Sequence, residues 1–565
     1  MDEPPRNPLA CGALGRYDRA AVARIAAALP AAPSEVHADR RSCLWLDRQP
    51  LRWRSGLAQG LAWSERYPAP DPAGVRSWEA AATRLDACGL ALGPRRRAVH
   101  SSVSGVAPVY WIDHGDATYF ASRIDALVRG LELRLDVDWK AWAAILTMRL
   151  PLGERTPFRQ IRRLRQFTLL ERGRGGGEPT VRPWPWAQVE PSRDLGIAAD
   201  RVTGALLEAM RPLRASGAAV LLSGGLDSRV LLGLAHDAGV PLRALTAVAD
   251  DGIGWEAGLA EKAARAADAD FESFAIADPG EYRRLWLDHL EGSDFQFVLG
   301  AFVMPMGPRL EELGLPALDG LAFDVLAVRG GRFYTPEMLD PPDGYDAGVG
   351  LWQSLRAKTM QGAAERALQG PYARALLRSS RRQFRREAAP FRGLRNQALL
   401  TQYSTRMLRG VATVPGQTMG RHANVFTPCA SDRVAPAILG LDPSEKRERR
   451  LYEAVFDRIA SPAARSPTVA DSTRPRAVPH ARRTGFSPPM VAFYARSLRE
   501  GPLAPVLGRK LAAGLRDGTL GEAIHGMALH RAAMAVTAFH SWAERYDSQL
   551  RPIDPAALLE EEVEP

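Results

Sequence analysis

Cysteine and long apolar runs are scarce in this sequence, and their scarcity excludes several classes of protein. Four cysteines occur among 565 residues, far apart and without a C-x-x-C pair, which argues against a disulfide framework or a zinc site and favours a reducing cytoplasm. The ten histidines form no H-E-x-x-H motif of the kind that binds zinc. No stretch approaches the roughly 18 apolar residues of a membrane-spanning helix. The opening "MDEPPRNP" differs from a secretory signal, so we expect a cytoplasmic protein without a membrane partner.

Lysine is also scarce, and arginine supplies most of a formal net charge of +10. A basic surface attracts nucleic acid, acidic peptide or nucleotide. The sequence shows neither a basic stripe nor a nucleic-acid-binding motif. We therefore expect no nucleic-acid partner and interpret most of the arginines as part of a solvated surface.

The length exceeds that of one compact core, so several domains are expected. Residues 1–180 are rich in predicted strands, with a hairpin around Gly115 in "VAPVYWIDHGDATYFAS". Asp18 is a candidate cap for a helix over 18–29. Residues 171–191 are dense in glycine and proline, which predicts a turn and an extended linker at a domain boundary.

Beyond this linker the pattern changes to alternating helices and short apolar strands over residues 192–340. The predicted strands are "AAVLLSGG", "PLRALTAVA", "DFESFAI" and "GLPALDG". Strands separated by helices form right-handed βαβ units, which predicts a parallel sheet. Residues 341–565 are predicted to be mostly helical. The expected fold class is therefore α/β, with an α+β N-terminal domain.

The most informative motif is "VLLSGGLDSR", in which a buried strand enters a glycine turn and a helix follows. Glycines allow close approach to a ligand, and the first amides of the helix favour an anion. Asp227 would repel a bare phosphate, so it predicts a bridging Mg²⁺. The lysine of the ordinary phosphate loop is missing. We predict a nucleotide-binding turn made by Ser223, Gly224, Gly225, Leu226, Asp227 and Ser228; the alternative is a glycine-rich turn without a ligand.

S-G-G-x-D-S resembles the pyrophosphate loop of the AMP-forming ATP pyrophosphatases, which implies ATP and Mg²⁺ as cofactors. In the asparagine-synthetase branch of that superfamily a later strand ends in S-G-E-G-x-D-E, and "LDGLAFDVL" is similar to it. Asp319 stands at the serine, Gly320 and Asp324 match, and Leu321 and Val325 replace the glutamates. The resemblance implies that Asp227 and Asp324 share one magnesium ion. The alternative for Asp324 is a helix N-terminal acid.

The family's catalytic lysine is missing from this sequence. Spacing from "RRLYEAVFDRIASP", which resembles the preceding helix of the family, puts its position near Ala470. Positive charge for developing anions is then expected from the next loop, with Arg474 and Arg476 as the catalytic candidates and Arg482 and Arg483 as further ones. The alternative is a basic surface loop.

The N-terminal part resembles the glutaminase domain of glutamine-dependent asparagine synthetase. "CGALGRYD" is similar to the family's opening C-G-I-x-G-x-x-D, and the resemblance implies an Ntn-type β-sandwich. Such a glutaminase uses the chain's own α-amine as the base for its cysteine, but ten residues precede Cys11. The R-G-P-D and N-G-E-x-Y-N segments that bind glutamine are not found between Ala31 and Arg97. We therefore expect an inactive glutaminase domain.

Together these resemblances imply a ligase that adenylates a carboxylate, releases pyrophosphate and couples the acyl group to an amine. Branches of the family without glutaminase include β-lactam-type synthetases and lasso-peptide cyclases. The leading hypothesis is a lasso-peptide macrolactam cyclase, with a precursor peptide as substrate and a leader-processing protease as a partner. The arginine-rich segment 376–397 could hold an acidic peptide. The alternatives are a β-lactam-type synthetase, a glutamine-dependent asparagine synthetase lacking residues 1–10, and a non-catalytic nucleotide-binding scaffold.

Overall fold

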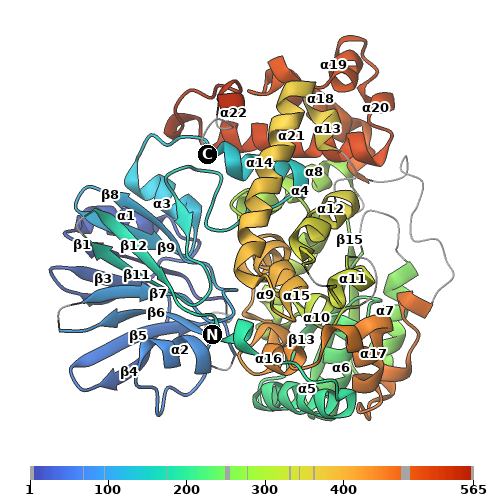
Figure 1. The fold of residues 1–565 in the computed structure, drawn as a ribbon. Coiled ribbons are helices and arrows are strands. Elements are labelled where there is room, and N and C mark those ends of the chain that lie inside the picture. The colour runs from blue at the N-terminus through green and yellow to red at the C-terminus, as the bar shows by residue number, and fades with distance from the viewer. Residues whose placement is uncertain are drawn as a thin grey trace.

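Two halves of different architecture lie side by side (Figure 1). The computed structural model describes residues 6–67, 69–94, 96–173, 175–248, 255–276, 278–329, 333–342, 344–359, 363–471 and 484–560. The first half contains two antiparallel sheets of six strands each, and the second contains a parallel sheet of five strands surrounded by helices. The expectation of a mixed α/β protein with a strand-rich N-terminal part is confirmed.

The two antiparallel sheets stack face to face in the orders β10-β8-β9-β1-β3-β2 and β12-β11-β7-β6-β5-β4. Buried side chains of both sheets, including Leu44, Leu90 and Phe120, form one hydrophobic cluster between them. Helices cover both outer faces, α1 and α3 on the first sheet and α2 on the second. The elements are β1 Ala10–Gly15, α1 Arg19–Ala27, β2 Ser34–Ala38, β3 Ser42–Leu46, β4 Leu51–Ser55, β5 Ala58–Ser64, α2 Trp78–Arg84, β6 Ala87–Leu92, β7 Arg97–His100, β8 Tyr110–His114, β9 Ala117–Ala121, α3 Ile124–Leu131, β10 Arg162–Arg163, β11 Thr168–Gly173 and β12 Gly176–Val181.

Local sequence explains where several of these elements begin and turn. β8 and β9 form the predicted hairpin, with His114 opposite Ala117 and Gly115 at a φ of 57°, a left-handed conformation that favours glycine. Asp18 caps the predicted helix α1 by accepting the Ala20 N–H at 2.9 Å. Both predictions are confirmed.

Within residues 171–191 the predicted turn is present, but the residues on both sides of it form paired strands, so the linker begins later than predicted. Residues 171–173 and 176–181 belong to β11 and β12, which pair along their length. Glycine allows the close approach here, because a Cβ on Gly173 would lie 1.8 Å from the Glu178 carboxylate. The glycines therefore form part of a tight hairpin, and the irregular segment toward the second half begins only after Val181.

The parallel sheet has the order β15-β14-β13-β16-β17. Its strands are β13 Ala218–Leu221, β14 Leu242–Val248, β15 Asp270–Ala275, β16 Ala317–Leu318 and β17 Val425–Phe426. The first four are the predicted strands. One face packs on α5 (Leu195–Met210), α6 (Asp227–Asp237), α7 (Trp255–Ala266), α16 (Val434–Leu439) and α17 (Arg450–Phe456). The opposite face packs on η3 (Ala301–Met306), α9 (Gly307–Leu313) and η6 (Val414–Met419).

Helices fill the rest of the second half, in agreement with the helical character predicted for residues 341–565. They are α8 Pro279–Gly292, α10 Phe323–Leu326, α11 Pro336–Leu339, α12 Ala347–Thr359, α13 Ala364–Ala367, α14 Gly370–Ala388, α15 Gln397–Gln402, the π-helix η5 Tyr403–Val411, α18 Pro488–Glu500, α19 Arg509–Arg516, α20 Leu520–Ala523, α21 Met527–Arg545 and α22 Ala557–Glu560. The described residues include no helix with the length and apolar character needed to cross a bilayer.

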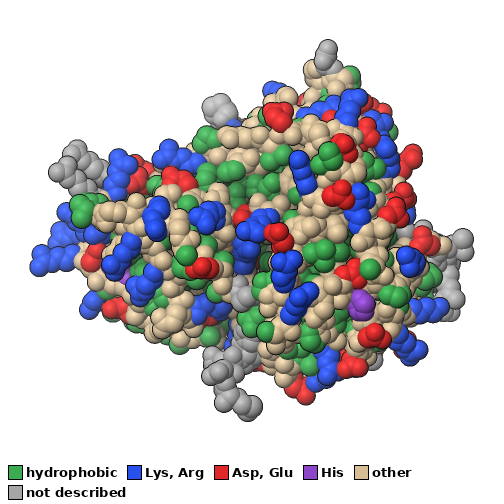
Figure 2. Space-filling view, turned by 90° about the horizontal axis from the view of Figure 1, so that it is seen from below, with side chains coloured by type: hydrophobic (Ala, Val, Ile, Leu, Met, Phe, Trp, Pro, Cys, Tyr) green, Lys and Arg blue, Asp and Glu red, His purple; other side chains and the backbone are tan. Residues whose placement is uncertain are grey.

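The two halves are not separable at residue 180. Helix α4 (Trp139–Met148) precedes that residue, yet it packs against α14 and α21. Trp139 stacks on Phe539 with ring centroids 5.4 Å apart, and Trp142 lies 5.2 Å from Trp542. The surface seen from below carries basic side chains over both halves, interspersed with acidic and apolar ones (Figure 2).

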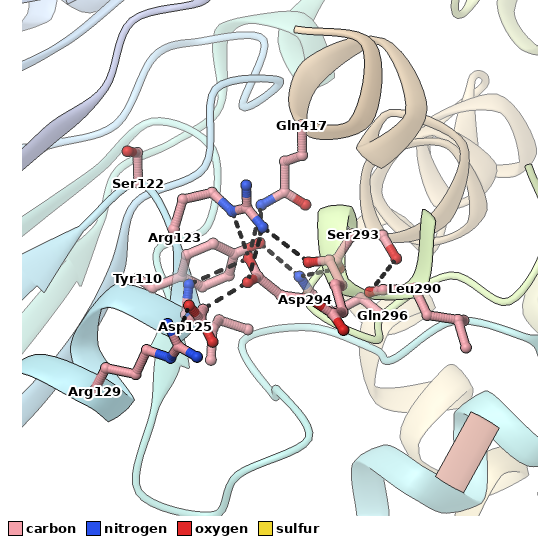
Figure 3. Close-up of polar contacts among 12 residues, drawn as sticks. Tyr110, Ser122, Arg123, Asp125, Arg129, Leu290, Ser293, Asp294, Gln296 and Gln417 are labelled. Carbon is pink, nitrogen blue, oxygen red and sulfur yellow. Dashed lines mark hydrogen bonds and ion pairs between the residues drawn. The ribbon is translucent and has the colours of Figure 1, made fainter. Parts of the chain in front are cut away.

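A buried ion pair joins the halves (Figure 3). Asp294, whose side chain is fully buried, accepts two hydrogen bonds from Arg123, at 3.1 and 3.2 Å. It also accepts the first N–H groups of α3, from Ile124 and Asp125, and the Gln417 amide at 3.2 Å. One carboxylate of the second half thus caps a helix of the first, where a negative charge is favourable.

Two other carboxyl groups lie near this interface, those of Glu65 and Asp86, and both have raised pKa values. Burial, together with the charge of Asp86, raises the pKa of Glu65 from 4.5 to about 8. Burial raises the pKa of Asp86 to about 7. The folded protein therefore holds protons that the unfolded chain releases at a lower pH.

This difference predicts a stability that falls as pH rises. Between about 4.5 and about 8 the folded state keeps the Glu65 proton and the unfolded state does not, so the free energy of unfolding decreases across this window. Glu65→Gln has no proton to lose and should show a smaller decrease. Urea unfolding below, within and above the window measures the difference. Glu79→Gln, in the partly exposed first turn of α2, is the control, and equal slopes for all three proteins would contradict the prediction.

Candidate nucleotide-binding site

The strand order of the parallel sheet reverses between β13 and β16. Ligands of open α/β sheets bind at such a point, beyond the carboxyl ends of the strands. The turn after β13 carries Ser223 to Ser228, and the turn after β16 carries Asp319 to Asp324. Both turns line one cavity of about 260 Å³. This volume is slightly below the range of about 300–1,000 Å³ that small-molecule sites usually have. The structure thus brings the two predicted motifs together.

Hydrogen bonds fix the turn after β13. The Ser223 N–H donates to Ser228 Oγ at 3.0 Å, and the Gly225 N–H donates to Ser223 Oγ at 3.2 Å. Gly224 must be glycine, because a Cβ there would lie 2.7 Å from Val469. Ser223, Asp227 and Ser228 line the cavity, whereas Gly224, Gly225 and Leu226 shape the turn.

Asp227 is held by two partners from distant parts of the chain. The Tyr452 hydroxyl donates to Asp227 Oδ1, and Arg329 Nη1 lies 3.2 Å from Asp227 Oδ2. Burial, followed by the negative charge of Asp324, raises the pKa of Asp227 to about 6. Burial also raises the pKa of Asp319 to about 6, although the Leu321 N–H donates to it at 2.8 Å. Three carboxyl groups therefore crowd one end of the cavity, where a cation would relieve their repulsion.

The crowded carboxyl groups can be compared with the ligands that the predicted magnesium ion needs. No group of three or more His, Cys, Asp or Glu side chains is arranged to hold a metal within the described parts of the chain, so the site is not a closed protein cage. Mg²⁺ in nucleotide sites needs only one or two carboxylates, since phosphate oxygens and water complete its shell. Asp227 and Asp324 both line the cavity and meet this requirement. Arg329 occupies one oxygen of Asp227, and an ion bound to that oxygen would displace it.

Backbone strain marks the second turn. Ala322 has a φ of 77° and a ψ of −18°, in the left-handed region that a residue with a Cβ rarely adopts. Such strain gathers at functional sites. Gly320 lies against the first turn, because a Cβ there would be 2.9 Å from Asp227 Cβ. The two turns therefore touch, and the strained residue orients Asp324 in the first turn of α10.

Ala322→Gly should relieve this strain. We expect the free energy of unfolding to stay unchanged or to rise by up to about 1 kcal/mol, since the relief exceeds the entropy that glycine adds to the unfolded chain. Ala205→Gly within α5 is the matched control and should cost about 1 kcal/mol. Urea unfolding of both variants checks the difference, and an equal loss in both would show that position 322 carries no strain.

The far end of the cavity is apolar. Leu245 and Ala247 of β14 face Phe302 and Met306 of η3, and Phe302 is 36% exposed. This arrangement suits a flat ring between apolar side chains.

The π-helix η5 forms another wall of the cavity. Arg406 and Met407 line the cavity from it. The Arg406 guanidinium lies 4.4 Å from the Phe333 ring and 3.8 Å from Asp324 Oδ2. π-Helices are rare and are frequent at functional sites. Arg406 is thus a cation oriented by an aromatic ring beside the carboxyl groups.

The predicted catalytic arginines, Arg474 and Arg476, lie outside the described residues, as do Arg482 and Arg483. The segment just before them is described. The Val469 N–H donates to Gly224 O at 2.8 Å, and the buried Arg229 donates to Ser466 O at 2.7 Å. Ala470, the position predicted for the lost lysine, therefore follows a residue that touches the turn.

Arg329, Tyr452 and Arg406 were not expected from the sequence. They lie about 100, 225 and 180 residues from Asp227 along the chain. Arg329 and Arg406 belong to no local motif. Tyr452 lies in the segment that resembles the family's helix before the catalytic lysine, so it alone had a sequence signal.

Cys11, which stands at the position of the glutaminase nucleophile in the resemblance, is fully buried in β1. Burial, with a contribution from Cys43, raises its pKa well above the usual range, so its nucleophilic thiolate form is disfavoured. The residues before it are also part of the fold. Asn7 donates to Gly416 O at 3.0 Å and accepts the Val425 N–H at 2.8 Å. These contacts tie the segment before Cys11 to β17.

Known proteins give no independent assignment for this site. No protein-family model matches the chain, and no curated protein matches its sequence.

Proposed function

We propose that this protein is an ATP-dependent amide-forming ligase of the asparagine-synthetase type. It adenylates a carboxylate and releases pyrophosphate; an amine then attacks the acyl-adenylate, forming the amide and releasing AMP. The observation that carries the proposal is the convergence of the Ser223–Ser228 turn and the Asp319–Asp324 turn on one cavity at the strand-order reversal. The left-handed Ala322 supports it, because it stands at the second glycine of the family's S-G-E-G-x-D-E motif.

Each part of the cavity has a role in this reaction. The N-terminus of α6 and the Ser223 and Ser228 hydroxyls bind the phosphates. Asp227 and Asp324 would hold Mg²⁺, which neutralises the charge of the departing pyrophosphate. Arg329 and Arg406 provide positive charge near the same groups, where negative charge develops. The apolar end beside Phe302 takes the base.

The amine does not come from glutamine in this proposal. We assign the first half to a degenerate Ntn-type glutaminase domain, since the thiol of Cys11 is buried. The amine then belongs to a second substrate or to the same molecule. The most specific form of the proposal is a cytoplasmic lasso-peptide macrolactam cyclase, which closes a ring on a precursor peptide supplied by a leader-processing protease. A β-lactam-type synthetase is the small-molecule alternative.

Product analysis tests the reaction class. Purified protein is incubated with ATP, Mg²⁺ and a panel of peptides and amino acids with free carboxylates and amines. The proposal expects AMP and pyrophosphate, with a substrate mass lowered by one water for a cyclisation. Formation of ADP and phosphate would overturn it. A non-catalytic nucleotide-binding scaffold is the alternative, suggested by the engagement of both Asp227 oxygens. It would be favoured if no carboxylate supports ATP–pyrophosphate exchange and Asp227→Asn retains biological function.

The glutamine-dependent alternative makes a different prediction. It requires removal of ten residues, and this would break the Asn7 contacts with Gly416 and Val425. Intact mass of the active enzyme distinguishes the two cases. A mass that begins at Cys11, together with ammonia released from glutamine, would support a working glutaminase and overturn the degenerate assignment.

A further inference from the structure

A second cavity, of about 490 Å³, is lined by residues that do not line the nucleotide cavity. We call it the arginine groove. Its walls are the segment 152–165 of the first half and α14 of the second, the long helix that runs along the junction of the halves (Figure 1). Its volume falls in the range of about 300–1,000 Å³ that ligand sites occupy. The predicted peptide-binding segment 376–397 begins within α14.

The arginine groove has an excess of positive charge. Six basic and three acidic side chains line it. The acidic ones are engaged: Asp138 pairs with Arg155 at 2.8 Å, and Glu154 and Glu387 both pair with Arg165. Three exposed arginines have no carboxylate partner among the described residues, namely Arg159, Arg162 and Arg386. Three guanidinium groups around one groove attract carboxylate or phosphate groups.

The other polar groups of the groove favour a polypeptide with carboxylate groups over a nucleic acid with phosphate groups. Gln383 is 8% exposed and lines the groove, and its Oε1 has no hydrogen-bond donor in the described structure. A polypeptide supplies N–H donors for Gln383 and for the carboxylates of the wall, along with acidic side chains for the arginines. A phosphodiester backbone has no N–H donor to offer Gln383. Leu152 and Ile161 add apolar contact.

The groove is connected to the nucleotide site through the π-helix η5. Arg409 of this helix donates to Arg155 O at 2.6 Å, and Leu408 O accepts from Arg163 at 2.8 Å. Arg406 and Met407 of the same helix line the nucleotide cavity. One short helix therefore lines the nucleotide cavity and contacts the wall of the arginine groove.

We propose that the arginine groove binds an acidic segment of a polypeptide substrate, whose reacting carboxylate enters the nucleotide cavity across η5. The assignment of this polypeptide as a substrate rests on the proposed ligase function. The binding itself depends only on the groove. Arg159, Arg162 and Arg386 hold the acidic side chains, and Gln383 accepts a backbone N–H.

Binding of a fluorescein-labelled oligoglutamate peptide, followed by anisotropy in low salt, tests the groove. We expect binding that weakens as salt is added and that falls by about tenfold or more in Arg159→Ala/Arg162→Ala/Arg386→Ala. The control is Arg54→Ala/Arg201→Ala/Arg211→Ala, which removes the same charge from exposed sites elsewhere and should bind as the native protein does. Should the triple variant fold poorly, Arg386→Glu on the exposed side of α14 replaces it and should show the same direction of change.

Two outcomes would overturn the proposal. One is equal loss of oligoglutamate binding in the groove and control variants, which would reveal only an effect of net charge. The other is equally tight, equally groove-dependent binding of an oligothymidylate of the same charge, which would mark a general anion site. Asp227→Asn separates the groove from the ligase function, since it should keep oligoglutamate binding and lose ATP–pyrophosphate exchange. Groove-dependent binding in a protein that never cleaves ATP would refute the ligase and retain the peptide groove.

Discussion

Asp227→Asn is expected to lower ATP–pyrophosphate exchange by about a thousandfold. The substitution keeps the shape of the side chain but removes the charge that, in the proposed reaction, would hold Mg²⁺ against the phosphates, a contribution of several kcal/mol to the transition state. Asparagine still accepts from the Tyr452 hydroxyl, and the loss of the Arg329 pair costs little because that side chain is 41% exposed. The buried, crowded carboxyl group also costs the folded state energy, so this variant should be no less stable than the native protein.

Stability and activity must therefore be measured together for Asp227. Exchange is followed with labelled pyrophosphate, and unfolding with urea. Asp200→Asn, on the exposed side of α5 with a 69% exposed side chain, is the matched control and should leave exchange unchanged. Exchange within a few fold of the native rate in Asp227→Asn would remove Asp227 from the catalytic site and, with it, the proposed magnesium position.

Asp294→Ala is expected to cost about 3–5 kcal/mol of the free energy of unfolding. The substitution leaves Arg123 buried without its partner, which is among the most expensive single changes in a protein interior. It also removes the acceptor of the first N–H groups of α3 and the Gln417 amide. The φ of 50° at residue 294 adds strain for alanine. All of the lost hydrogen bonds and ion pairs lie at the contact between the two halves.

Further variants separate the causes of this loss. Asp294→Asn tolerates the left-handed backbone and keeps an acceptor, so it should cost less than alanine. Adding Arg123→Met to Asp294→Asn removes the unpaired charge and should restore part of the stability. Asp288→Ala, which breaks a surface pair with Arg421 at 3.4 Å, should cost no more than about 1 kcal/mol. A similar small loss in Asp294→Ala would show that the ion pair does not hold the halves together.

Local patterns were enough to predict much of the parallel sheet and half of the site. Each of its first four strands is a short apolar run followed by a turn and a helix, so β13 to β16 were predictable. β17 is as short as β16, and it was missed because it follows a long, mostly helical stretch, outside the alternating strand and helix pattern of residues 192–340. Asp227 and Asp324 were predictable because each lies in a motif after a strand. Arg329 and Arg406 reach the same cavity through tertiary packing, which leaves no local signal.

In the glycine-rich stretch after residue 171, the local pattern was misleading instead of silent. Composition alone does not distinguish a linker from a tight hairpin, because both need residues without a bulky side chain. The pairing of Leu169 with Thr180 and of Glu171 with Glu178 decides the matter, and it depends on contacts across the turn. Similarly, α4 was counted with the first half by its place in the chain, while its tryptophans pack on residues 539 and 542.

The anchoring of Asn7 has a consequence for synthesis on the ribosome. Its hydrogen-bond partners are residues 416, 420 and 425, so about 400 more residues must be translated before they exist. At about 5–20 residues per second, that is a wait of roughly 20–80 s. The strand that follows, β1, lies inside its sheet between β9 and β3. The nascent chain can therefore assemble its first sheets early, but the segment around Asn7 is fixed in place among the last steps.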